Sequence, residues 1–217
     1  MRPIMVKAAA LSLVTAVAIG MSTLPARADQ AAVNLTTPGE IYSGAPYTLG
    51  FEFAPNVNMS ITSLGTFVDT GDGLASAGTV GIWDTSGDLL LSVTVPAGSA
   101  ANIQGDFAYQ AVTPFALTAG TDYIIGSYDT GDASSLDTDQ EGSGSFNPDI
   151  TVISDEYSET ESFSFPNKND GFMGAWLGGN FLFTTSSSTV PEPGTLALLA
   201  LGLAGVALTL IRRRRMR

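Results

Sequence analysis

The side chains of this sequence that can do chemistry are almost all carboxylates. The chain has 21 acidic residues, no histidine and no cysteine. Between residues 29 and 190 it holds 20 of these acids and one basic residue, Lys168. This inventory cannot build a Ser/His or Cys/His nucleophile, lacks the usual zinc and copper ligands, and offers no arginine clamp for phosphate. Kinase, protease, phosphatase and oxidoreductase chemistry is therefore excluded.

Carboxylate chemistry is the catalytic route that remains. Glycoside hydrolysis needs only two Asp or Glu side chains at a suitable separation. The spacing of the acids singles out no such pair, because most of them stand beside Gly, Ser or Thr in turns, where Asp bonds its own backbone. We therefore expect a protein that is not an enzyme, with a carboxylate-based glycoside hydrolase as the less favoured alternative.

One acidic segment resembles a calcium loop in part. Asp137, Asp139 and Glu141 stand at positions 1, 3 and 5 of a loop with glycine at position 6, as in an EF-hand. Position 12 is Pro148 and no flanking helices are expected, so a true EF-hand is excluded. A looser calcium site on these three residues is one interpretation, and solvated acidic turns are the other. The same choice applies to the two Asp-Thr-Gly-Asp segments, at residues 69–72 and 129–132.

Aromatic residues suggest a second kind of site, one that stacks on sugar rings. The candidates are Trp83 and Trp176, with Tyr109 and Tyr128 as further aromatic faces. Trp83 falls on the strand face opposite its apolar neighbours, which favours a surface role. The alternative is ordinary packing, which is the commoner use of tryptophan in a β-sandwich.

The charge between residues 29 and 190 limits the partners of the protein. With 20 acids and one base the formal charge is −19, compared with −12 for the whole chain. Such a surface repels nucleic acid and anionic lipid, because it has no cations to replace the counterions of phosphate. Nucleic-acid binding is excluded, and divalent cations are attracted.

The hydrophobic pattern predicts an all-β fold. Short runs alternate apolar and polar residues with period two and are separated by Gly-, Asp- and Pro-rich turns. Many short strands at this spacing predict a single antiparallel β-sandwich, jelly-roll-like in character. The expected strands are 47–53, 61–68, 79–83, 89–95, 107–112, 123–128, 151–153, 163–165 and 181–185. Residues 129–149 are expected to form a long loop.

The N-terminus has the three parts of a secretory signal peptide. Two basic residues precede an apolar run of 12 residues, 8–19, and Ala26 and Ala28 form the small-residue site for signal peptidase. The run is too short to span a bilayer comfortably, since a spanning helix needs about 20 residues. Residues 1–28 are therefore expected to be removed.

The C-terminus has the parts of a membrane-retained sorting signal. Pro191, Glu192 and Pro193 precede an uncharged segment, 195–211, and four arginines, 212–215. Seventeen residues make a helix of about 26 Å, close to the thickness of a hydrocarbon core. Arginines directly after such a helix stay in the cytoplasm, which places the preceding domain outside.

This C-terminal arrangement resembles the PEP-CTERM sorting signal of Gram-negative bacteria that make extracellular polysaccharide. The resemblance implies recognition in the inner membrane by an exosortase, which cuts near the motif and passes the protein to the surface. A plain single-pass anchor is the alternative. Residues 63–128 also resemble, more loosely, an uncharacterised β-sandwich domain of secreted bacterial proteins, which implies a fold and no activity.

These features together predict four segments and one function. The segments are a signal peptide (1–28), an extracytoplasmic β-sandwich (29–183), a Ser/Thr linker (184–190) and a PEP-CTERM signal with transmembrane helix and cytoplasmic tail (191–217). We expect an exported surface or extracellular-matrix protein with a structural or adhesive role beside exopolysaccharide. A carbohydrate-binding module is the main alternative, and calcium is the one cofactor considered.

Overall fold

The computed structural model describes residues 28–37, 41–42, 47–68, 73–128, 135–136, 143–169, 171 and 176–185. Within these ranges the chain forms strands and turns and no helix. Accordingly, none of the described residues belongs to a helix that could cross a membrane. The expected transmembrane helix at 195–211 and the signal peptide lie outside the described residues, apart from Ala28.

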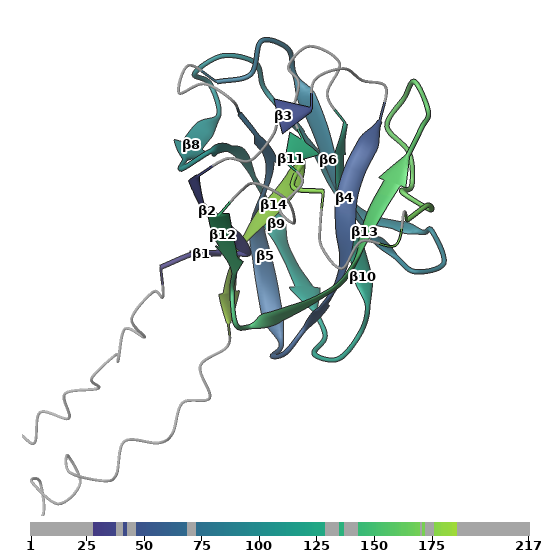
Figure 1. Cartoon of the computed structure of the whole chain (residues 1–217). Helices are drawn as coiled ribbons and strands as arrows, with labels where there is room; N and C mark the ends of the chain where they lie inside the picture. The colour runs from purple at the N-terminus through teal and green to yellow at the C-terminus, as the bar shows by residue number, and fades with distance from the viewer. Residues whose placement is uncertain are drawn as a thin grey trace, which may run out of the picture.

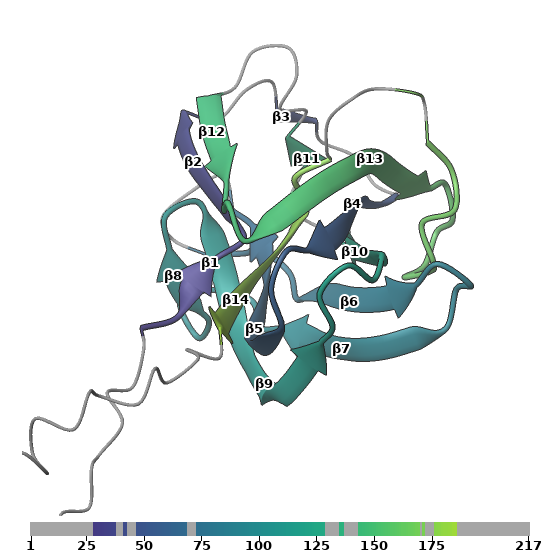
Figure 2. The same ribbon diagram turned by 90° about the horizontal axis from the view of Figure 1, so that it is seen from below.

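Two five-stranded antiparallel sheets make up the body of the fold (Figures 1 and 2). The first sheet has the order β1-β14-β5-β9-β8 and the second β13-β4-β10-β6-β7. The strands of the first sheet are β1 (Gln30–Ala31), β14 (Gly179–Thr185), β5 (Met59–Phe67), β9 (Phe107–Leu117) and β8 (Asn102–Gln104). Those of the second are β13 (Ile150–Ser158), β4 (Thr48–Pro55), β10 (Tyr123–Tyr128), β6 (Gly78–Asp84) and β7 (Leu89–Val95).

Two short ribbons complete the fold. Strand β2 (Val33–Thr37) pairs with β12 (Ser143–Phe146), and β3 (Ile41–Tyr42) pairs with β11 (Ser135–Leu136). Figures 1 and 2 agree in placing the β2–β12 ribbon beside β1 and β8, at one flank of the sandwich. The ribbon therefore adds a wall next to the first sheet.

The core lies between the two sheets, because the alternating residues of each strand point to opposite faces. Phe51 and Phe53 of β4 turn inward, and so do Phe181 and Phe183 of β14; each is fully buried. The rings of Phe53 and Phe181 meet across the sandwich with centroids 5.0 Å apart. Burying each such side chain contributes about 1.5–3 kcal/mol, which is how a chain without disulfides holds its sheets together.

The all-β antiparallel sandwich is confirmed, and the expected strands 89–95 and 123–128 match β7 and β10 residue for residue. Two expectations are wrong. Residues 129–149 are not one loop, since β11 and β12 fall within them. Residues 163–165 are not a strand. They belong to an irregular segment, residues 159–168, that lies across the outer face of the second sheet. Strand β14 also runs through Thr185, two residues into the segment expected to be linker.

The two ends of the domain lie side by side. Gln30 at the start of β1 pairs with Phe183 near the end of β14, and Ala31 pairs with Leu182. Because the strands are antiparallel, the chain enters and leaves the sandwich at the same end (Figure 1). Strand β14 itself is internal, between β1 and β5, so the last segment of the domain is part of its core.

Candidate binding site

The two tryptophans expected to stack on sugars have different surroundings. Trp83 of β6 does face away from the core, as its neighbours Val80 and Ile82 are fully buried inside. Its own side chain is nevertheless only 3% exposed. Trp176 is half-buried and donates its backbone N–H to the carbonyl of Gly50 at 3.2 Å. Sugar stacking therefore remains a prediction for both, and in this structure the Trp83 ring is already covered.

The cover is a strap formed by residues 159–168, which follows β13. The rings of Phe163 and Phe165 lie over Trp83, with centroid distances of 5.0 and 6.2 Å. The sheet has room for the strap because three paired residues of its outer face are glycines: Gly50, Gly126 and Gly81. A Cβ on Gly81 would stand 2.6 Å from Phe163, and one on Gly126 2.9 Å from Pro166. Because these positions carry no side chains, the outer face of the sheet has space for the strap.

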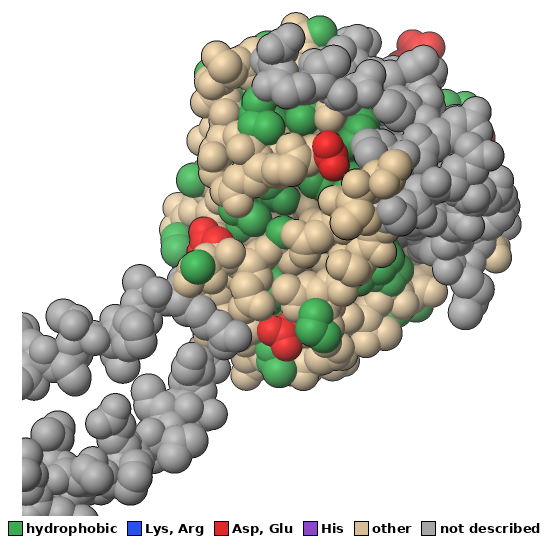
Figure 3. Space-filling view, turned by 60° about the vertical axis from the view of Figure 1, so that its left-hand side comes forward, with side chains coloured by type: hydrophobic (Ala, Val, Ile, Leu, Met, Phe, Trp, Pro, Cys, Tyr) green, Lys and Arg blue, Asp and Glu red, His purple; other side chains and the backbone are tan. Residues whose placement is uncertain are grey.

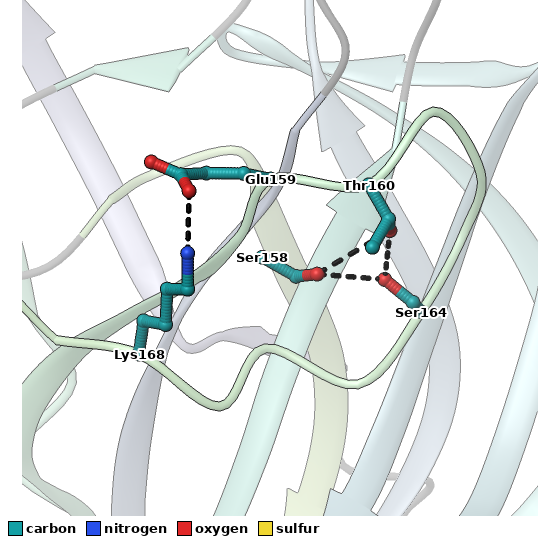
Figure 4. Close-up of polar contacts among 5 residues, drawn as sticks. All are labelled: Ser158, Glu159, Thr160, Ser164 and Lys168. Atoms are coloured by element: carbon teal, nitrogen blue, oxygen red, sulfur yellow. Dashed lines mark hydrogen bonds and ion pairs between the residues drawn. The ribbon is translucent and has the colours of Figure 1, made fainter.

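Polar contacts hold both ends of the strap (Figure 4). Ser158 and Ser164 hydrogen-bond at 2.8 Å, Thr160 contacts both hydroxyls, and the backbone N–H of Ser164 donates to Thr48 Oγ1 at 3.2 Å. Lys168 forms an ion pair with Glu159. The hydrogen bond to Glu159 raises the pKa of Lys168. Both side chains are about half exposed, so this ion pair adds little stability compared with the buried aromatic rings.

Removing the aromatic cover should expose Trp83. We expect Phe163→Ala with Phe165→Ala to lower the free energy of unfolding by about 2–4 kcal/mol, because two half-buried rings are lost. The emission of Trp83 should shift to the red as water reaches its ring. Fluorescence in a Trp176→Phe background isolates Trp83, and Glu161→Ala in the same strap is the control. Unchanged emission of the double variant would contradict this account of the strap.

Two carboxylates, those of Glu52 and Glu156, share one serine hydroxyl on the outer face of the second sheet. Ser154 Oγ lies 3.3 Å from Glu52 Oε2 and 3.0 Å from Glu156 Oε1. Burial raises the pKa of Glu156, and the nearby Glu52 and Asp155 carboxylates add to this effect. Glu156 is only 7% exposed. A carboxyl group buried to this extent is poorly placed to reach a sugar substrate, and glycoside hydrolysis stays an untested alternative.

The proposed calcium residues and the sorting motif cannot be placed. Asp137, Asp139 and Glu141 lie outside the described residues, as do Ala26, Pro191, Glu192 and Pro193. Ala28 is described and is exposed. Within the described ranges, no group of three or more acidic side chains is arranged to hold a metal ion.

A pocket that the sequence did not indicate lies between the β2 ribbon and the β8–β9 hairpin. Its volume is about 120 Å³, and its lining comes from β1, β2, β8, β9 and the hairpin turn. Its floor is formed by Val33, Phe107 and Tyr109, each only 2% exposed, and the apolar side chains that a ligand can reach are the half-buried Ala31 and Leu35. Asn34 and Gln104 are exposed, Asp106 is half-buried, and these three supply the polar groups of the lining. An apolar lining with a few polar groups is the usual composition of a ligand-binding site.

The local sequence explains why the pocket is shaped in advance. Gly105 has a φ of 58°, so that Gly105 and Asp106 make a two-residue hairpin turn between β8 and β9. The ring of Tyr109 lies against Gly65 of the neighbouring strand β5. A Cβ at that position would stand 2.5 Å from the ring, so glycine leaves the space that the ring occupies. Burial raises the pKa of Tyr109, which keeps its phenol neutral.

The opposite wall is fixed by Asn180 of β14, which is fully buried. Its side-chain Nδ2 donates to the carbonyl of Val33 at 2.9 Å, and its Oδ1 accepts from the N–H of Val33 at 3.1 Å. The amide thus pairs with β2 as a neighbouring strand would, and it holds Val33 at the edge of the pocket.

Two family models match the chain. The model described as a domain of unknown function, DUF4082, covers residues 35–177, which is more than half of the chain. The model of the PEP-CTERM protein-sorting motif covers residues 189–215. No curated protein matches the chain. The sorting motif identifies an exported, membrane-anchored precursor that an exosortase processes for the cell surface.

Proposed function

We propose that this chain, which belongs to the DUF4082 family and is exported as an exosortase substrate, acts outside the cell as a non-enzymatic structural or adhesive protein associated with exopolysaccharide. Its β-sandwich is the displayed module, and the sorting signal delivers it. The matching family supplies a fold without an assigned activity, so the proposal rests on the architecture of the chain.

The observation that carries the proposal is the position of the two ends of the sandwich. The chain enters at β1 and leaves at β14, side by side at one end of the domain. Five residues separate Thr185 from Pro191, a span of at most about 20 Å when extended. Until the C-terminal segment is processed, a domain tethered in this way keeps its anchored end near the membrane and presents its opposite end and both flanks to the outside.

The proposed topology places the domain outside the cytoplasm and the arginine cluster within it. Four consecutive arginines follow the apolar segment, and positive charge beside a spanning helix is retained in the cytoplasm. The signal peptide supports the same arrangement, because it directs the residues that follow it across the membrane.

Weak contacts made by many displayed copies would suffice for adhesion. When one domain is bound, its neighbours on the same polysaccharide chain bind at a high effective concentration. The charge of −19 between residues 29 and 190 disfavours anionic polymers unless divalent cations bridge the two. We therefore propose neutral polysaccharide as the direct partner, or an acidic one bridged by calcium.

Co-sedimentation with polysaccharide from the producing strain tests the proposal. The unprocessed precursor, purified in detergent with its C-terminal segment, should pellet with the polymer at physiological ionic strength, where non-specific charge effects are screened. An unrelated detergent-solubilised protein of similar net charge is the control. If the protein stayed in the supernatant both with millimolar calcium and with a chelator, the proposed association with exopolysaccharide would be wrong.

A further inference from the structure

The pocket between β2 and the β8–β9 hairpin limits its ligand by size. Its space of about 120 Å³ is small for a binding site, because ligand pockets usually have about 300–1,000 Å³. A small substituent of a sugar ring therefore matches it better than a whole sugar unit does. We expect the ligand to insert a side group and leave its main body outside.

The lining limits the ligand by chemistry. Ala31 and Leu35 offer apolar surface that forms no hydrogen bonds with water, so a methyl-sized apolar group is favoured there. Asn34 and Gln104 carry amides that both donate and accept, and the Asp106 carboxylate accepts only. The group that fits has a methyl end, a carbonyl oxygen and an N–H.

The charge of the lining excludes an anionic group and favours a neutral one. The lining holds one acid, Asp106, and no basic residue. The flank that carries β1, β2 and β8 comes forward in Figure 3, where acidic side chains appear as isolated spots among hydrophobic and uncharged ones and no basic side chain is visible. A neutral polymer can approach this flank despite the acidity of the domain.

We propose that this pocket binds the acetamido group of an N-acetylated hexosamine in a neutral polysaccharide. The acetyl methyl contacts Ala31 and Leu35, and the amide N–H donates to Asp106. The N–H distinguishes an acetamido group from an O-acetyl ester, which has no donor for that carboxylate. This inference deepens the proposed function, on which it rests, by naming the sugar that the displayed domain contacts.

The test uses the same full-length precursor in detergent and the trisaccharide of N-acetylglucosamine as the probe. Saturation-transfer NMR should show the strongest transfer to the acetyl methyl protons, and calorimetry gives the affinity. The deacetylated trisaccharide should show no such contact with the pocket, and an O-acetylated sugar should bind more weakly.

Two variants of the rim probe the same contact independently. Asp106→Ala with Gln104→Ala removes the acceptor and one amide, and should weaken binding at least about tenfold, as expected for the loss of two hydrogen bonds. Asn34→Trp should fill the entrance of the pocket and abolish saturation transfer to the acetyl methyl protons. Asn102→Ala is the matched control, because Asn102 is exposed on the same face of β8 but does not line the pocket. Thermal unfolding shows that each variant is folded.

The outcomes separate this inference from the proposed function. If the wild-type protein showed no saturation transfer to the acetyl methyl protons, or if Asn34→Trp showed as much as the wild type, the pocket assignment would be overturned. If the same protein still pelleted with the producer's polysaccharide, the proposed function would stand and the contact would lie elsewhere. If Asn34→Trp lost both co-sedimentation and saturation transfer to the acetyl methyl, the result would support both the pocket assignment and the proposed function.

Discussion

Replacing Gly50 by alanine is expected to prevent the sandwich from folding. A Cβ on Gly50 would lie 1.7 Å from the carbonyl oxygen of Ile125, on the neighbouring strand β10. The atom in the way belongs to the backbone, so no rotation of a side chain can relieve the contact. Strands β4 and β10 would have to separate at the centre of the second sheet, and we expect a loss of about 4 kcal/mol or more.

A series of glycine substitutions gives this expectation its controls. Gly81→Ala meets the side chain of Phe163, which can move, so an intermediate loss with displacement of the strap is expected. Gly120→Ala has open space around it and should cost only about 1–2 kcal/mol for its left-handed backbone, where φ is 72°. Urea unfolding of the three variants checks the order. A Gly50→Ala protein as stable as Gly120→Ala would contradict the pairing described for β4 and β10.

Replacing Pro191, Glu192 and Pro193 by alanines is expected to stop surface delivery while leaving membrane insertion intact. Insertion depends on the apolar segment at 195–211 and its flanking arginines, which the change does not touch. Processing depends on the sorting motif, as in other signals where a hydrophobic tail holds the chain until an enzyme acts. The folded domain is also untouched, because β14 ends at Thr185.

The intact mass of the protein in a host with the matching exosortase measures this effect. Wild-type protein should lose its C-terminal segment, and the triple-alanine variant should keep it in the membrane fraction. Alanine at Ser186, Ser187 and Ser188 is the matched control, since it changes three neighbouring residues outside the motif. Equal processing of both variants would show that the motif is not what the enzyme reads.

The strands that alternation predicts are those with one face in the core. Strand β10 was predicted in full because Tyr123 and Ile125 face the core and turn residues bound it on both sides. Strand β9 runs five residues beyond the expected 107–112, through Pro114. A proline normally argues against a strand, but here it lies in a register shift between β5 and β9.

Sequence reasoning failed where the pairing partner lies far along the chain and the strand has little apolar surface. Strand β12 reads Ser-Gly-Ser-Phe and is recognisable only through its pairing with β2, more than a hundred residues earlier. The segment at Phe163 and Phe165 has the alternation of a strand. Its apolar residues instead cover the outer face of the second sheet, over Trp83.

The candidate site shows the same division. Tyr109 was among the aromatic residues expected to meet a sugar, and it does line the pocket. The hairpin residues 104–107 of the lining are close to Tyr109 in sequence, but residues 31–35 come about 75 residues earlier. The Asn180 side chain that holds Val33 comes about 70 residues after Tyr109. No local pattern links these segments, because only the sheet order brings them together.

The most direct test of the central claim is the location of the domain in cells with and without the exosortase. The account predicts that protease added to intact producing cells removes the β-sandwich from the wild type. In a strain lacking the exosortase the domain should stay protected and remain with the inner membrane, still carrying its C-terminal segment. Equal accessibility of the domain in the two strains would contradict the claim that this is an exosortase-sorted surface protein.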